Sequence, residues 1–278
     1  MAFTIQTNSL ANTAMRNLGI TEERLTSTVQ KLATGSRINK AADDPAGLAI
    51  SDQMNATIRS LGQAQRNAQD AVSLVQVFEG GTTEISNMLM RIRELAIQSA
   101  SDTVGDRERG MLDLEVQELK GEITRVARTT SYMDRELLAG ENVRLEFQVG
   151  VNNDETRDRI IFDPGNTNLT ADGLGVGDLS ASSKEAAQMS LETADGAILR
   201  VNELRAKIGS TQNRLMTTIN SQGIFAENLM QAKSRIRDAD MAVETTNLTR
   251  ESILRQAGVA VLATANQNPK LALQLLNQ

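Results

Sequence analysis

The sequence has 278 residues, of which 40% are hydrophobic, 23% charged and only 2% aromatic, and it contains no histidine, cysteine or tryptophan. These absences exclude zinc fingers, disulfide scaffolds, haem ligation by His or Cys, and Ser–His–Asp or Cys–His catalysis. The formal net charge of −6 argues against general nucleic-acid binding, which requires a basic surface. We therefore expect no enzyme, no catalytic residue, no metal and no other cofactor.

The same composition favours helices. A core with almost no rings must be filled by Ala, Leu, Ile, Val and the 11 Met, which suit helix seams better than sheet sandwiches. No apolar stretch approaches the roughly 18–20 residues that span a bilayer, so no membrane insertion is expected. The first residues have neither a basic nor an apolar region of the kind found in a secretory signal, so we expect no cleaved signal peptide.

The first predicted helix carries a heptad seam. Its apolar residues follow one another at steps of 3, 7, 4 and 3, and they are Met15, Leu18, Leu25, Val29 and Leu32. Gly35 ends this series as a C-terminal capping glycine would.

A second helix is predicted to begin after Asp43-Asp44-Pro45, because a carboxylate cap followed by proline is a strong helix start. If it continues to about Ser99 it is roughly 80 Å long. Gly80-Gly81 is its expected weak point. A turn at 102–105 precedes a third helix, whose apolar positions are Leu112, Val116, Leu119, Ile123 and Val126.

The middle of the chain predicts a β-hairpin. Leu145 to Val149 alternates with period two, Asn152-Asn153-Asp154 is typical of a turn, and 160–162 is the expected return strand. Residues 166–183 are predicted to form an irregular segment with scattered apolar anchors: Leu169, Leu174, Val176 and Leu179.

Helical periodicity returns from about Ser183, and again from Ala239 in the last segment. That last segment has a face of mostly apolar residues at alternating steps of 3 and 4, with Pro269 as a site for a local kink: Leu254, Ala257, Val261, Thr264, Asn268, Leu271 and Leu275. The whole pattern predicts a mainly α protein, an elongated antiparallel helical rod or coiled coil with a small β-hairpin insert. The two apolar ends would pair with each other, and repeated self-association would cover what remains exposed.

Several blocks of the sequence resemble bacterial flagellins. They include Leu32-Ala-Thr-Gly-Ser-Arg-Ile-Asn39, Ala42-Asp-Asp-Pro-Ala-Gly-Leu-Ala-Ile50 and Arg91-Ile-Arg-Glu-Leu-Ala-Ile-Gln98. Ser234-Arg-Ile-Arg-Asp-Ala-Asp240 resembles a further block near the other end. The likeness covers most of the chain in the family's order, with little room for the variable outer region that many flagellins carry.

This resemblance implies an inner terminal coiled-coil domain of residues 1–41 plus 240–278, and a rod domain of residues 42–239 with the hairpin at about 143–163. No separate outer domain is expected. The implied function is a structural subunit of the bacterial flagellar filament, which serves swimming motility. The alternative is a hook–filament junction protein with similar terminal arms.

The resemblance also implies partners and sites. The inner assembly seam would consist of Met15, Leu18, Leu25, Val29, Leu32, Leu254, Ala257, Val261, Leu271 and Leu275. An export chaperone would cover Leu254, Val261, Leu262, Leu271 and Leu275. Arg91, Leu95 and Glu115 fall where an innate Toll-like receptor reads flagellin, although subunit contacts and core packing are the stronger explanation.

Further implied partners are copies of the chain itself, the flagellar export apparatus, the hook-associated junction and cap proteins, and other flagellins. The implied location is an extracellular filament reached without signal cleavage, with a periplasmic flagellum as the alternative.

Overall fold

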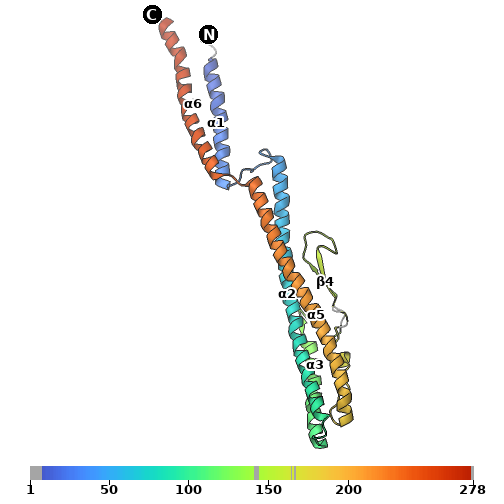
Figure 1. Cartoon of the computed structure of the whole chain (residues 1–278). Helices are drawn as coiled ribbons and strands as arrows, with labels where there is room; N and C mark the ends of the chain where they lie inside the picture. The colour runs from blue at the N-terminus through green and yellow to red at the C-terminus, as the bar shows by residue number, and fades with distance from the viewer. Residues whose placement is uncertain (1–7, 141–143, 164, 166, 277–278) are drawn as a thin grey trace. The chain divides into compact units, whose positions relative to one another are not determined.

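The computed structural model describes residues 8–140, 144–163, 165 and 167–276, and the side chains within these ranges up to residue 267. Its long helices are α1 (Ser9–Thr34), α2 (Pro45–Ser99), α3 (Asp106–Thr129), α5 (Lys184–Arg237) and α6 (Met241–Leu276). The shorter elements are β1 (Ser131–Tyr132), β2 (Arg135–Glu136), β3 (Leu145–Gln148), β4 (Arg159–Phe162) and α4 (Ala171–Leu174) (Figure 1). The predicted mainly α class with a small β-hairpin is confirmed.

The chain folds as two compact units. One contains the ends of the chain, up to Ile58 and from Glu227, and the other is Arg59–Ala226. Both bounds fall inside long helices, α2 and α5, whereas the predicted domains meet between helices at 41–42 and 239–240. That predicted division stays a prediction.

The helix ends follow the local chemistry of the sequence. Gly35 ends α1 with φ 66°, in the left-handed region that glycine adopts without strain. The Oδ1 atom of Asp44 accepts a hydrogen bond from the backbone amide of Gly47 at 2.9 Å, and so caps α2 where Pro45 begins it. The predicted start of the second helix is therefore confirmed.

Helix α2 runs without interruption through Gly80-Gly81. A Cβ at Gly81 would lie 2.7 Å from Leu138 Cδ1 and 2.7 Å from Thr130 Oγ1. The segment after α3 thus packs directly on the α2 backbone at Gly81, within the expected weak point. This packing stabilises the helix there.

The unit Arg59–Ala226 holds the main apolar core. Phe78 of α2 and Phe162 of β4 are buried with ring centroids 5.4 Å apart, in an edge-to-face arrangement. Around them lie apolar side chains from α2, α3 and α5, including Leu89, Ile123 and Ile208. The predicted anchors of the irregular segment, Leu169, Leu174, Val176 and Leu179, are all buried in the same core.

The predicted hairpin is formed by β3 and β4, with Leu145 opposite Phe162 and Gln148 opposite Arg159. Side chains from two helices donate hydrogen bonds to main-chain carbonyls of the hairpin. Asn67 Nδ2 of α2 donates to the Gln148 carbonyl at 3.2 Å, and Gln222 Nε2 of α5 donates to the Val149 carbonyl. The hairpin is therefore bound to both α2 and α5.

Three small elements were not predicted. Strands β1 and β2 are joined by Met133 and Asp134, both at positive φ (49° and 62°), as in the tight turns of two-residue hairpins. Helix α4 is a single turn capped by Thr170, whose hydroxyl accepts from the Gly173 amide at 3.2 Å.

Candidate assembly surfaces

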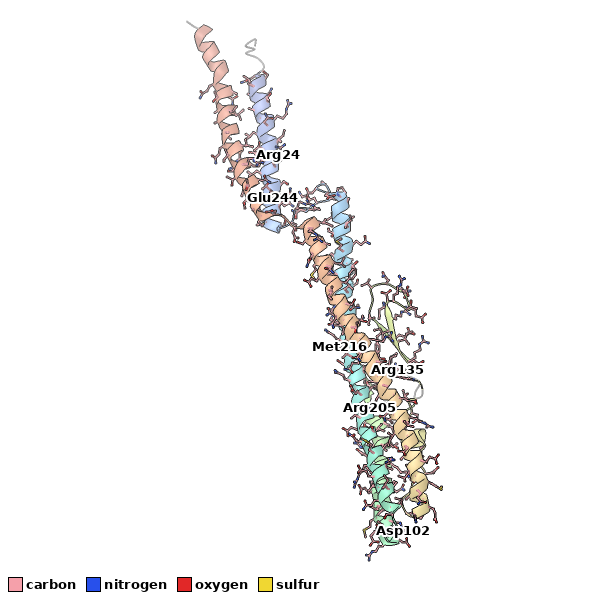
Figure 2. All side chains as sticks on the ribbon, viewed as in Figure 1. Arg24, Asp102, Arg135, Arg205, Met216 and Glu244 are labelled. Atoms are coloured by element: carbon pink, nitrogen blue, oxygen red, sulfur yellow. The ribbon has the colours of Figure 1, made fainter. Side chains whose placement is uncertain are left out.

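The helices of the terminal unit, α1 and α6, form an antiparallel pair. Asn8 Nδ2 donates to the Ala265 carbonyl at 2.8 Å near one end of the pair, and Lys31 Nζ lies 3.9 Å from Glu244 Oε1 near the other. Figure 2 shows Glu244 at the start of α6. The start of α1 therefore contacts the later part of α6, and the end of α1 contacts the start of α6. The two terminal segments pair with each other as predicted, in antiparallel orientation.

Each helix of this pair turns toward the other a face that includes a line of residues seven positions apart. On α1 the line is Ala11, Leu18, Leu25 and Leu32, all buried or half-buried. On α6 it is Glu244, Glu251, Gly258 and Ala265, also buried or half-buried. A Cβ on Gly258 would lie 3.2 Å from Leu18 Cδ1, so the missing side chain of Gly258 gives Leu18 its place.

The predicted seam residues are divided between two faces. Leu18, Leu25 and Leu32 lie in the contact between α1 and α6. Met15 and Val29 on α1, and Leu254, Ala257 and Val261 on α6, are exposed. The side chains of Leu271 and Leu275 lie outside the described residues. The covered face of α1 also includes Ala14, Thr21 and Thr28, as expected when both lines of a heptad seam face one partner helix. The exposed apolar residues lie beside this face and stay open for other contacts.

The exposed apolar seam residues of α1 and α6, called here the open lines, have further exposed apolar neighbours that the sequence analysis missed. Exposed Leu10 and Ile20 lie on α1, and Met241, Val243, Ile253 and Val259 lie on α6. They fall outside the heptad pattern, so only their apolar character could have signalled them. The missed inner line of α6 is polar or small, and its signal was the seven-residue spacing alone.

The expected chaperone residues have a similar distribution. Leu254 and Val261 are exposed, at 47% and 58%, while Leu262 is half-buried. Leu271 and Leu275 again lie outside the residues with described side chains. The exposed pair lies on one side of α6, seven residues apart, where a partner helix would reach both.

Arg91 of α2 and Glu115 of α3 come together on the surface of the other unit. Arg91 Nη2 lies 2.8 Å from Glu115 Oε1, and Arg91 Nη1 lies 3.2 Å from Glu94 Oε2. The hydrogen bonds that Arg91 donates to Glu115 and, with a smaller effect, to Glu94 raise the pKa of Arg91. The third expected receptor residue, Leu95, is 1% exposed and packs in the core, so the exposed part of this group is the ion pair alone.

The described residues hold no group of three or more acidic side chains arranged to bind a metal ion. No helix in the described ranges is both long and apolar enough to cross a membrane. The described residues instead form paired long helices with exposed apolar side chains. These features are typical of proteins that pack against copies of themselves or against partners.

Comparison with known proteins agrees with this class. The family model described as the bacterial flagellin N-terminal helical region matches residues 5–143, and the model of the bacterial flagellin C-terminal helical region matches residues 191–276. The chain belongs to the bacterial flagellin family, a family of structural filament proteins and not of enzymes.

Curated relatives match along nearly their whole length. A flagellin of Halalkalibacterium halodurans is 41% identical over 98% of this chain and 99% of its own. A flagellar filament 30.7 kDa core protein of Treponema maltophilum is 39% identical over 95% of this chain and 96% of its own. Such full coverage of short relatives agrees with a flagellin that lacks a large outer region.

Solved structures show the same fold. The crystal structure of Bacillus cereus flagellin has a TM-score of 0.50 and 30% identity, covering 56% of this chain and 88% of that one. A Vibrio parahaemolyticus structure described as a flagellar hook-associated protein has a TM-score of 0.57 at 14% identity, covering 70% of this chain and 100% of that one. The second likeness concerns the fold alone.

Proposed function

We propose that this chain is a structural subunit that assembles with copies of itself into the bacterial flagellar filament and so serves swimming motility. The observation that carries the proposal is the near-complete match to flagellins, 41% identical over 98% of the chain. The open apolar lines on α1 and α6 support it, because a filament gives each copy neighbours that cover such lines.

The terminal pair supports assembly in a second way. In the 26 residues of α1 only Ala11 and Thr28 are buried. Ordering a backbone costs about 1–2 kcal/mol per residue, which so little burial does not offset. We infer that α1 and α6 gain most of their stability from neighbouring copies. In a dilute monomer, amides near Leu18 and Leu254 should exchange quickly with solvent, and in filaments slowly; strong protection in both states would contradict the inference.

A hook–filament junction protein is the alternative, and the number of copies separates the two. Filaments sheared from cells and analysed by quantitative mass spectrometry should contain thousands of copies of this chain per filament. A number sufficient only for one ring at the base would replace the filament proposal with the junction protein.

The same proposal includes partners in export and a location. An export chaperone would bind the exposed Leu254 and Val261 and so prevent early polymerisation, and the flagellar export apparatus would deliver the chain to the filament end. The expected location is outside the cell, without removal of a signal peptide, and a periplasmic filament is the alternative. Mass spectrometry of the N-terminal peptide from filaments tests the first point, and immunogold labelling of intact cells tests the second.

Receptor recognition is the remaining expectation for Arg91 and Glu115. A receptor would have to read the exposed ion pair in the free chain, since Leu95 is buried. Arg91→Ala in a reporter assay tests this, and an unchanged response would remove Arg91 from such a site.

A further inference from the structure

Three cations recur every seven residues along α5. They are Arg200, Lys207 and Arg214, and all three are exposed. Seven residues of helix rise about 10.5 Å and complete nearly two turns, so these side chains form one line. Within the described part of the chain, Arg200 and Arg214 have no carboxylate within ion-pair distance.

This line, called here the α5 cation line, borders two hollows beside the hairpin and the segment that follows it. Arg200 and Lys207 line one of about 330 Å³, together with Glu203, Gly165 and Leu174. Arg214 lines the other, of about 400 Å³, together with Arg159. Both hollows are wide enough for a carboxylate side chain that arrives from outside. In a chain of net charge −6, such a cationic line stands out.

Acidic residues recur at the same interval on α3. Glu108, Glu115 and Glu122 are seven residues apart, and Glu118 lies on the same side of the helix. We call these four residues the α3 acid line. Glu115 and Glu122 have partners in their own chain, Arg91 at 2.8 Å and Arg125 at 2.5 Å. Glu108 and Glu118 are exposed and make no ion pair within the described residues.

Apolar side chains accompany both lines. Met111 and Leu114 lie beside the α3 acid line, and Leu199 lies beside the α5 cation line; all three are exposed. Each surface therefore combines apolar area with like charges that recur at an interval of about 10.5 Å, as partner-selecting positions in helical assemblies do. Opposite charges are interspersed on both: Arg91 and Arg125 pair with the acid line, and Glu203 lies between Arg200 and Lys207.

The two lines do not pair within one chain, yet they match in spacing and are opposite in charge. We propose that, in the filament that the proposed function requires, the α3 acid line of one copy docks on the α5 cation line of the next. The two surfaces are different parts of the same unit, so the contact is head-to-tail. A head-to-tail contact whose rotation does not close produces an open helical polymer, which is what a filament is.

Charge reversal tests this pairing, since like charges facing each other at an interface are costly. The acid-side variant is Glu108→Lys with Glu118→Lys, which leaves the intrachain ion pairs of α3 intact. The cation-side variant is Arg200→Glu with Arg214→Glu. Each purified variant is mixed with short filament seeds at low salt, and the critical concentration for growth is measured by sedimentation.

We expect each variant alone to raise the critical concentration at least about tenfold. A chain carrying all four substitutions should recover growth on seeds made from itself, because its lines are complementary again. An equal mixture of the two single-side variants should recover for the same reason. Matched controls are Glu185→Lys with Glu192→Lys and Arg107→Glu with Arg128→Glu, exposed residues outside both lines. These should grow as the wild type does.

The outcomes separate this inference from the filament proposal. If the wild type and the controls grow and the line variants grow equally well, the pairing is wrong while self-assembly stands. If both single-side variants fail and the fourfold exchange does not recover, the two lines do not meet. If the wild type itself does not grow on its own seeds, the filament proposal fails first. Circular dichroism of each monomer confirms that helix content is unchanged.

Discussion

The backbone amide of Arg37 donates a hydrogen bond to the carbonyl of Arg237, 2.6 Å away. Beside it, Ala239 donates to the Gly35 carbonyl at 2.9 Å, and Ser36 and Asp238 form an antiparallel bridge. The connection from α1 to α2 is thereby joined to the connection from α5 to α6. These residues belong to two of the blocks that carry the flagellin resemblance, and the two blocks share the structural role of holding both terminal helices at one junction.

Gly35 is the residue that lets α1 enter this junction. Its φ of 66° disfavours any side chain, although a Cβ there would meet nothing within 4 Å. Gly35→Ala should therefore destabilise the terminal unit by about 1 kcal/mol through backbone strain alone. Gly19→Ala is the control, since Gly19 lies inside α1 with the same open space, and it should stabilise the helix by about 0.5–1 kcal/mol. Thermal unfolding of filaments, in which α1 is ordered, measures both by circular dichroism, and equal effects of the two would contradict the account.

Gly80 and Gly81 offer a second matched comparison within α2. Gly80→Ala should stabilise the helix by up to about 1 kcal/mol, because a Cβ there meets nothing. Gly81→Ala should destabilise by about 1–3 kcal/mol, because its Cβ would press on Thr130 and on the fully buried Leu138. Urea unfolding of the two variants measures the difference. A stabilised Gly81→Ala would show that α2 and the segment after α3 do not pack this closely.

Asp43 gives the junction a dependence on pH. Its Oδ2 accepts hydrogen bonds from the backbone amides of Lys40 at 2.9 Å and Asn39 at 3.0 Å, and these bonds lower the pKa of its carboxyl. A lowered folded-state pKa contributes stability above the unfolded value of about 3.9, and this contribution is lost as the pH falls through the folded value.

Asp43→Asn should thus lower the melting temperature at neutral pH, and the difference from the wild type should shrink below about pH 3. Asp70→Asn serves as the control, because Asp70 is exposed on α2 and makes no ion pair within the described ranges. A difference for Asp43→Asn that stayed constant across this pH range would mean that the carboxylate charge is not what holds the turn.

The open line on α6 predicts an assembly defect without a folding defect. Val261 is 58% exposed, so Val261→Asp should leave the helix content of the monomer unchanged. In a filament the new carboxylate would be buried against a neighbour, and seeded growth should fall at least about tenfold. Thr249→Asp is the matched control on an exposed polar position of the same helix. Normal growth of Val261→Asp would remove this line from the assembly contacts.

Much of the fold could be predicted because its signals are local. Gly35, Asp44 and Pro45 mark helix ends by their own backbone chemistry, and the alternation at 145–149 marks a strand. Strands β1 and β2 could not be predicted, because two-residue strands have no period and neither Met133 nor Asp134 is the glycine that such turns usually carry. The packing at Gly81 was also out of reach, because it depends on Leu138, which is distant in sequence.

The candidate assembly surface could be predicted as a heptad pattern but not as two faces. The pattern places Met15 and Leu18 in one seam, and only the position of α6 shows that Leu18 faces inward while Met15 stays open. The inner line of α6 was missed because Glu244 and Gly258 are not apolar. A polar or small residue in a seam is readable only when its partner, here Lys31 or Leu18, is known.

The central claim is self-assembly through the paired terminal helices, and seeded growth viewed by negative-stain electron microscopy tests it most directly. Purified protein mixed with seeds should form long uniform filaments, and a chain without residues 240–278 should form none, because it lacks both the partner of α1 and the open line of α6. Filaments formed equally well by the shortened chain, or wild-type protein that stays monomeric on its own seeds, would contradict the claim.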